Sequence, residues 1–532
     1  MSRKQRRAQA KARGQRKVDR SSAGHGRADA SRLAAARSMM QAGQFVQGYA
    51  IYRSLIFARP GGASLVPELV QVLFQRGALA EAEAFVGRAS ECFPTDAAVW
   101  LQLGHARQKV GRADGAIEAY QRSLALAPDS AHAWAAIAQV HERLHRQDAA
   151  LDAIDKAIAL LPESYLLVHC RGVILRRLAR TEEAMRIQES VLRDAPARDA
   201  AMRYLVWREF SLLHRADGDA AASRRALATA KDEQAPLRAS YLNAFAGYQR
   251  EVARRFAGFD VEVARSWHQA RLGGGDDPAL RQAFIVGHPR SGTTLTEQVL
   301  AAHPDVLTLD EREALPHIEA SAFGSTPTAR QLDRLSPQQR RQFVCMYREE
   351  SERYLGEPIG DKLLVDKRPD SLLMWPTILR TMPASKLLVV IRDPRDVCAS
   401  CYRQGFELGV ISAQFHSIAS TCRYYAWFMA HWLELKQRLP ESTWHEVRYE
   451  SLVSDFEAAA LEITSFLGLE WDPAVLTYQD ASAQRLISTP SYTAVASLPT
   501  RDAIGGWREF ADAFEPAMPT LAPFLDALGY RD

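Results

Sequence analysis

Five prolines recur at one fixed spacing in the N-terminal part of the chain. Each stands 34 residues after the previous one, at Pro60, Pro94, Pro128, Pro162 and Pro196. An exact period of this length is typical of architectures in which one small helical unit is stacked several times, because a single unit cannot bury its apolar face alone. The spacing therefore predicts a stack of helix pairs in this part of the chain.

Small and large residues recur between the prolines at positions where paired helices would meet. Gly104 and Ala116 suit close helix crossings within one unit, and Trp100 and Tyr120 suit the gap between units. This pattern resembles the tetratricopeptide repeat. The resemblance implies an all-α solenoid of five units over residues 29–196.

The concave face of such a solenoid usually binds peptides or protein segments, so a protein or peptide partner is expected there. A structural spacer or an arm for homodimerisation fits the repeats equally well. Residues 197–276 continue a helical, charged pattern and are expected to cap the solenoid. The glycine-rich stretch 273–278 is typical of a linker into a further domain, residues 277–532.

The segment from Phe284 to Leu295 combines an apolar run, a turn rich in Gly, Ser and Thr, and the start of a helical pattern. A loop that enters a helix leaves backbone N–H groups unpaired, and these groups, with the positive end of the helix dipole, bind anions. Gly287 and Gly292 would let the backbone approach a ligand closely. The hydroxyl donors of this loop are Ser291, Thr293 and Thr294. The segment predicts a phosphate-binding loop; the alternative is a turn that only joins a strand to a helix.

The spacing from Gly287 to Thr294 imitates the P-loop of nucleotide-binding proteins, G-x-x-x-x-G-K-[ST], with Thr293 in place of the lysine. That lysine reaches the β- and γ-phosphates beside a magnesium ion. A loop without it suits a single phosphate better than a triphosphate, which argues against a P-loop-type nucleotide kinase or NTPase.

A second apolar run, Leu387–Ile391, shows no alternation and is expected to be a strand buried on both faces. Arg392 follows at its carboxyl end, where open α/β sheets bind ligands, and Ser400 lies two turns into the next helical pattern. Together they would bind a second phosphate. Taken alone, Arg392 is better explained as a surface ion pair with Asp393 or Asp396.

Two phosphate sites on one sheet, the first without the P-loop lysine, resemble the arrangement in sulfotransferases that use 3′-phosphoadenosine 5′-phosphosulfate (PAPS). Residues 289–294 are similar to the 5′-phosphosulfate loop of that family, and residues 391–400 to its 3′-phosphate segment. Within the family, tyrosylprotein sulfotransferases are most similar, since they share Arg-Ser-Gly-Thr-Thr-Leu and a following His-Pro-Asp, here 303–305. The resemblance implies a P-loop-like α/β domain with a central parallel sheet.

The resemblance also implies a role for each matching residue. Glu311 stands where these enzymes keep their general base, Arg290 where a loop arginine contacts the sulfuryl group, and Lys367 where a lysine assists the leaving group. Arg392 and Ser400 match the ligands of the 3′-phosphate. The other residues expected to contact the donor are Pro289, Ser291, Gly292, Thr293, Thr294, Tyr449 and Ser488.

Sulfuryl transfer needs residues of these types. A carboxylate can take the proton of the acceptor hydroxyl, and Arg290, Lys367 and the loop N–H groups can stabilise charge on the leaving phosphate. For Glu311 the alternative is a solvated carboxylate in the charged run 310–313, and Asp310 is its rival as the base. No metal is required, and the sequence has no H-E-x-x-H motif and no clustered His/Cys ligand set.

The chain is therefore expected to transfer a sulfuryl group from PAPS to a hydroxyl, with protein or peptide tyrosine as the first candidate acceptor. A carbohydrate or small-molecule hydroxyl is the alternative acceptor, and a non-catalytic tetratricopeptide scaffold is the alternative to an enzyme. Tyrosylprotein sulfotransferases place an arginine for acidic substrate peptides where this chain has Glu313. This departure argues against a preference for acidic peptides.

Residues 1–28 form a basic segment, with nine Lys or Arg residues and one Asp among the first twenty. We expect a disordered, solvated tail without a specific nucleic-acid partner. It lacks the apolar region of a secretory signal, and no stretch reaches the roughly 18 apolar residues of a membrane span. A cytoplasmic location without a transmembrane segment is therefore expected. Cys398 and Cys401 have the spacing of a redox pair but are expected to be buried packing thiols.

Overall fold

A computed structural model describes residues 29–40, 44–58, 60–269, 280–479 and 501–530. The basic segment 1–28, the glycine-rich stretch 273–278 and Ser488 lie outside the described residues. The described chain forms two compact units. The first comprises the residues up to Arg107 together with Gly115–Pro128, and the second comprises Gln108–Asp114 together with the chain from Asp129 onward.

The first unit consists of paired helices. Residues 29–40 are helical, and the elements that follow are α2 (Phe45–Phe57), the 3-10 helix η1 (Pro60–Leu65), α3 (Val66–Gln75), α4 (Leu79–Cys92), α5 (Ala97–Lys109) and α6 (Ala113–Leu126). Gly104 on α5 lies against Tyr120 on α6, because a Cβ atom at Gly104 would be 2.3 Å from the tyrosine ring. The small residue expected at the helix crossing is thus required by the close packing.

The second unit continues the helix pairs. Its helices before the sheet are α7 (Ala131–Arg143), α8 (Gln147–Leu160), α9 (Tyr165–Arg177), α10 (Thr181–Asp194), α11 (Ala200–Ala216), α12 (Ala220–Glu233), α13 (Ala235–Phe256) and α14 (Val261–Gln269). The hydroxyl groups of Ser130 and Ser164 accept backbone N–H bonds at the starts of α7 and α9, and so cap these helices. Pro128 and Pro162 lie in the turns just before the two caps. The predicted helical repeat is therefore confirmed.

Five parallel strands follow in the second unit. They are β1 (Gln282–Gly287), β2 (Val306–Asp310), β3 (Leu363–Lys367), β4 (Lys386–Ile391) and β5 (Trp444–Arg448), in the order β2-β3-β1-β4-β5. All residues of β1 are buried, as expected for a strand covered on both faces. The predicted central parallel sheet is confirmed.

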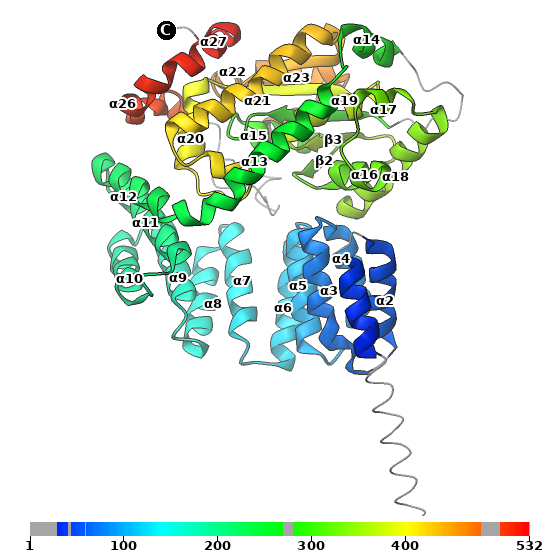
Figure 1. Cartoon of the computed structure of the whole chain (residues 1–532). Coiled ribbons are helices and arrows are strands. Elements are labelled where there is room, and N and C mark those ends of the chain that lie inside the picture. Colours follow the sequence, from blue (N-terminus) through cyan, green and yellow to red (C-terminus); the bar gives the residue numbers. More distant parts are fainter. Residues whose placement is uncertain (1–28, 41–43, 59, 270–279, 480–500, 531–532) are drawn as a thin grey trace, which may run out of the picture. The chain divides into compact units, whose positions relative to one another are not determined.

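Helices cover both faces of this sheet (Figure 1). The helices after β1 are α15 (Thr293–Ala301), α16 (Ala314–Phe323), α17 (Ala329–Asp333), α18 (Pro337–Leu355), α19 (Trp375–Thr381), α20 (Pro394–Arg403), α21 (Ile418–Arg438), α22 (Tyr449–Ser454), α23 (Phe456–Leu467), α26 (Ala511–Phe514) and α27 (Met518–Leu528). On one face, Ile285 belongs to a core cluster with Val299 of α15 and Ile463 of α23. On the other face, the ring of Phe284 lies 6.1 Å from that of Trp375. No helix in the described ranges is both long and apolar enough to cross a membrane.

The strand register brings the ends of three strands together. Lys367, the last residue of β3, pairs with Asp310 of β2 and with Ile285 of β1. Gly287, the last residue of β1, pairs with Val390 of β4. The loops that leave these strands therefore start from the same edge of the sheet, where ligands bind in open α/β folds.

Candidate active site

Two glycines shape the loop between β1 and α15. Gly287 has a φ angle of 148°, and a Cβ atom there would lie 2.5 Å from the carbonyl oxygen of Val390. Gly292 has a φ angle of 114°, and a Cβ atom there would lie 2.7 Å from the ring of Tyr449. Both positions combine a left-handed backbone with a close neighbour, so both require glycine.

The start of α15 offers hydrogen-bond donors to a ligand. Thr293 and Thr294 are its first two residues and are buried. The hydroxyl of Ser291 is also buried and has no hydrogen-bond partner among the described residues. A buried polar group without a partner is costly, which points to a ligand that supplies one. A phosphate or sulfate group at this helix start fits the need.

Two arginines and a serine lie beside this loop. Arg290 has a φ angle of 73°, and its Nε donates a hydrogen bond of 3.1 Å to the hydroxyl of Ser400 on α20. Arg392 follows β4 and donates to the carbonyl oxygen of Arg290 at 3.3 Å. Burial, together with the charge of Arg392, lowers the pKa of Arg290 from its usual value. An anion between the two guanidinium groups would relieve their repulsion.

The surface ion pair considered for Arg392 is wrong. Asp393 pairs with Arg395 at 2.8 Å, and Asp396 accepts hydrogen bonds from the backbone N–H groups of Gly505 and Trp507. Both carboxylates are therefore paired with groups other than Arg392. The guanidinium of Arg392 instead stacks over the Tyr449 ring, 4.5 Å from its centroid, and donates to the carbonyl oxygen of Ala503.

Lys367 lies among three carboxylates. Its Nζ is 2.6 Å from Asp310, 3.0 Å from Glu311 and 3.4 Å from Glu297 on α15. The lysine side chain is fully buried, with an exposed fraction of 0%. Burial opposes its charged form, but the three carboxylates outweigh burial and raise the pKa of Lys367 above its usual value. The ammonium group is therefore kept charged and fixed in position.

Glu297 is the most buried of these carboxylates, with an exposed fraction of 1%. Burial, and then the charge of Asp310, raises the pKa of Glu297 to about 8. A carboxyl with this pKa can hold a proton at neutral pH. The charge of the cluster around Lys367 therefore depends on pH near neutrality.

Glu311 differs from the other two carboxylates in its surroundings. Its φ angle is 50°, its backbone N–H donates to the carbonyl oxygen of Lys367 at 2.9 Å, and its side chain is 38% exposed. It lines a cavity of about 210 Å³ together with Arg290, Thr293 and Thr294. The other walls of this cavity are Pro289, Pro369, Asp370, Phe406, Ile411 and Tyr424. Of the two candidates for the base, Glu311 and Asp310, Glu311 is the one that lines the cavity.

The structure brings the described members of the predicted set to one edge of the sheet. These are Pro289, Arg290, Ser291, Gly292, Thr293, Thr294, Glu311, Lys367, Arg392, Ser400 and Tyr449. Their roles stay predictions, and Ser488 lies outside the described residues. Glu297 was not among the predicted residues, although it stands four residues after Thr293 on α15 and so on the same helix face. Tyr424 and Asp370 were not predicted either, because no motif in the sequence marks them.

Two parts of the chain match known family models. Residues 282–473 match the model of the sulfotransferase family. This part of the chain is a sulfotransferase domain. Residues 97–140 match the model of the tetratricopeptide repeat, in agreement with the helix pairs before the sheet.

Known proteins resemble the sulfotransferase domain at low identity. Protein-tyrosine sulfotransferase 2 of Gallus gallus is 27% identical over 266 residues, which cover 46% of this chain and 68% of that protein. Protein-tyrosine sulfotransferase A of Caenorhabditis elegans is 26% identical over 298 residues, which cover 53% and 76%. An uncharacterized protein of Aquifex aeolicus is 27% identical over 274 residues, but the match covers 49% of this chain and 35% of that protein. These matches support a sulfotransferase activity.

Two solved structures of sulfotransferase domains are similar to part of this chain. The domain from the Synechococcus olefin synthase is 21% identical, with a TM-score of 0.31, and the match covers 44% of this chain and 91% of that chain. The domain from the curacin biosynthetic pathway is 21% identical, with a TM-score of 0.33, and the match covers 47% and 97%.

Proposed function

We propose that this protein transfers the sulfuryl group of PAPS to the hydroxyl of a tyrosine in a protein or peptide. The observation that carries the proposal is one shared cavity. Glu311 lines it, and so do Arg290, Thr293 and Thr294 from the anion-binding loop. A proton acceptor and an anion site thus face the same space, as group transfer between two oxygens requires.

The two anion sites fit the two phosphate positions of the donor. The Ser291 hydroxyl and the N–H groups at the start of α15 suit the 5′-phosphosulfate. Arg392 and Ser400 suit the 3′-phosphate. Arg290 contacts both of these residues, so it would lie between the two groups.

The reaction needs one proton acceptor and stabilisation of one leaving group. Glu311 takes the proton of the tyrosine hydroxyl, the phenolic oxygen forms a bond to sulfur, and the bond from sulfur to the bridging oxygen of the donor breaks. Its electron pair stays on the leaving phosphate, where Arg290 and the N–H groups of α15 stabilise the negative charge. Lys367 contacts Glu311 and acts as a positioning residue; its contact with the leaving group stays a prediction.

The cavity walls favour an aromatic acceptor over a sugar. Phe406, Ile411 and Tyr424 also line this cavity. Apolar and aromatic walls gain more from burying a phenol ring than from burying a sugar with many hydroxyl groups. The relatives from Gallus gallus and Caenorhabditis elegans are named protein-tyrosine sulfotransferases, which agrees with this choice.

Calorimetry without magnesium tests the donor site. The purified chain should bind adenosine 3′,5′-bisphosphate, and Arg392→Ala should weaken this binding by at least tenfold, because a charge-assisted hydrogen bond is worth about 1.5–3 kcal/mol. Equal binding of ATP would contradict the donor assignment. With PAPS present, mass spectrometry should find sulfate on a tyrosine peptide and not on its Tyr→Ser counterpart. Sulfation of an oligosaccharide alone would replace the tyrosine acceptor with a carbohydrate.

A further inference from the structure

A larger cavity adjoins the one that Glu311 lines. Its volume is about 980 Å³, and it lies within the second unit. The two cavities share the lining residues Pro289, Asp370, Phe406 and Ile411. A molecule whose hydroxyl group reaches Glu311 would therefore extend into the larger cavity.

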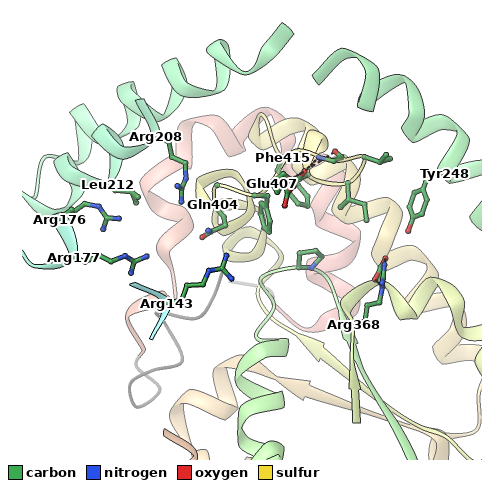
Figure 2. Close-up of a pocket in the computed structure, with 18 residues that line it drawn as sticks. Arg143, Arg176, Arg177, Arg208, Leu212, Tyr248, Arg368, Gln404, Glu407 and Phe415 are labelled. Atoms are coloured by element: carbon green, nitrogen blue, oxygen red, sulfur yellow. Dashed lines mark hydrogen bonds and ion pairs between the residues drawn. The ribbon is translucent and has the colours of Figure 1, made fainter. Parts of the chain in front are cut away.

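Arginines from the repeat helices and from the first helix of the expected cap line the larger cavity. Arg143 comes from α7, Arg176 and Arg177 from α9, and Arg208 from α11 (Figure 2). Figure 2 shows the guanidinium groups of Arg143, Arg177 and Arg208 extending toward Gln404. The opposite wall is the segment after α20, which also supplies Phe406 and Ile411 to the smaller cavity. Residues of the helices before the sheet and residues of the sulfotransferase domain thus line one cavity.

Two of these arginines have no carboxylate partner. Arg176 pairs with Glu209, and Arg177 pairs with Glu142. Arg143 and Arg208, both half-buried, form no hydrogen bond or ion pair with the described part of the chain. The Nε of Arg208 is fully buried. A half-buried charge without a partner carries a desolvation cost that an anionic ligand would remove.

The side chain of Arg208 lies close to the backbone at Gly405, in the segment after α20. A Cβ atom at Gly405 would lie 1.9 Å from the Nε of Arg208. Glycine therefore lets the guanidinium lie directly on the segment that leads to Phe406. Any larger residue would push Arg208 out of this place.

We infer that Arg143 and Arg208 bind carboxylate groups of the acceptor polypeptide, close to the tyrosine that Glu311 activates. This inference rests on the proposed function. Repeat solenoids usually bind polypeptides, and a cavity of this volume has room for several residues. Glu313, which argued against acidic peptides, pairs with Arg368 at 2.7 Å and is thus compensated. One repeat helix, α7, and the first helix of the cap, α11, supply the positive charge in place of the segment after β2, so the solenoid and its cap are part of the acceptor site.

Binding of two labelled peptides to the full chain tests the inference. Both contain one tyrosine, flanked by Glu residues in one peptide and by Gln residues in the other, and fluorescence anisotropy gives their dissociation constants. The Glu peptide should bind at least tenfold more tightly. Arg143→Gln and Arg208→Gln should each weaken the Glu peptide about tenfold, which is about 1.4 kcal/mol, and change the Gln peptide little. Arg193→Gln on α10 is the matched control, since this side chain is 72% exposed and does not line the cavity.

A second variant guards against misfolding of the arginine variants. The three atoms nearest to a Cβ at Gly405 all belong to the Arg208 side chain, so Gly405→Ala should displace this side chain, keep the fold and still weaken the Glu peptide. Equal affinity for the two peptides, or unchanged affinity in all three variants, would overturn the inference. Binding of a sulfated oligosaccharide that needs Arg143 and Arg208, with no binding of the Glu peptide, would also overturn it. Calorimetry with adenosine 3′,5′-bisphosphate separates these outcomes from a failure of the proposed function, because that failure abolishes nucleotide binding.

Discussion

Glu311 and Lys367 are joined twice. The backbone N–H of Glu311 donates to the carbonyl oxygen of Lys367 at 2.9 Å, and the Lys367 ammonium donates to the Glu311 carboxylate at 3.0 Å. The first contact sets the start of the loop after β2, and the second sets the direction of the side chain. The carboxylate is thereby held at the wall of the smaller cavity.

Replacing each of two neighbouring carboxylates tests the identity of the base. Glu311→Gln should lower kcat by about 10²–10⁴-fold, because the variant cannot take the acceptor proton. Asp310→Asn is the matched control: Asp310 also contacts Lys367 but does not line the cavity. Its loss of kcat should be much smaller. Initial rates with a tyrosine peptide measure both, and a larger loss in Asp310→Asn would assign the base to Asp310.

Replacing Lys367 tests the role of the buried ammonium. Lys367→Met should lower the free energy of unfolding by about 3 kcal/mol, because it leaves buried carboxylates without their cation. Above about pH 8, where Glu297 is ionised, adding Glu297→Gln should recover part of this loss, since it removes one of the unpaired carboxylates. Urea denaturation followed by circular dichroism measures both variants. A double variant less stable than the single one would contradict the explanation.

The raised pKa of Glu297 predicts a pH-dependent stability. Its pKa is raised from 4.5 to about 8, so between these values the folded state binds more protons than the unfolded state. The free energy of unfolding that protonated Glu297 contributes is then lost as the pH rises from about 4.5 to about 8. Glu297→Gln cannot titrate, so the variant should gain stability relative to the natural chain from about pH 5 to pH 8. Urea denaturation across this range checks the trend, and a constant difference would contradict it.

Alanine substitutions at two glycines with positive φ angles distinguish the effect of backbone strain on stability from the loss of nucleotide binding. Gly292→Ala should destabilise the fold by about 1–3 kcal/mol and abolish binding of adenosine 3′,5′-bisphosphate, because the new Cβ meets Tyr449. Gly324→Ala is the matched control: its φ angle is 66°, and nothing lies within 4 Å of the new Cβ. That variant should lose stability but keep nucleotide binding. Thermal unfolding and calorimetry measure the two effects, and equal nucleotide affinity in both variants would refute the loop assignment.

Local patterns in the sequence were sufficient to predict the paired helices and two of the five strands. The proline period predicted the paired helices, and the unbroken apolar runs before Gly287 and Arg392 predicted the buried parallel strands β1 and β4. Such patterns arise from neighbours in the chain, because burial of a helix face or a strand repeats over a few residues. The residues near the ends of these two strands could therefore be predicted as candidates for binding a phosphate group.

Contacts between distant elements were decided only by the tertiary structure. Asp310 and Glu311 are adjacent in sequence, and only the turn after β2 directs Glu311 to the cavity. Arg392 had two acidic residues close in sequence, yet it contacts Arg290 and Tyr449 instead. Arg143 and Arg208 line one cavity with the segment after α20, although they are far from that segment in the sequence. The sequence by itself determined the paired helices, the strands β1 and β4 and the loop expected to bind an anion. Packing decided which charges face the cavities, because that depends on which elements exclude water from each side chain.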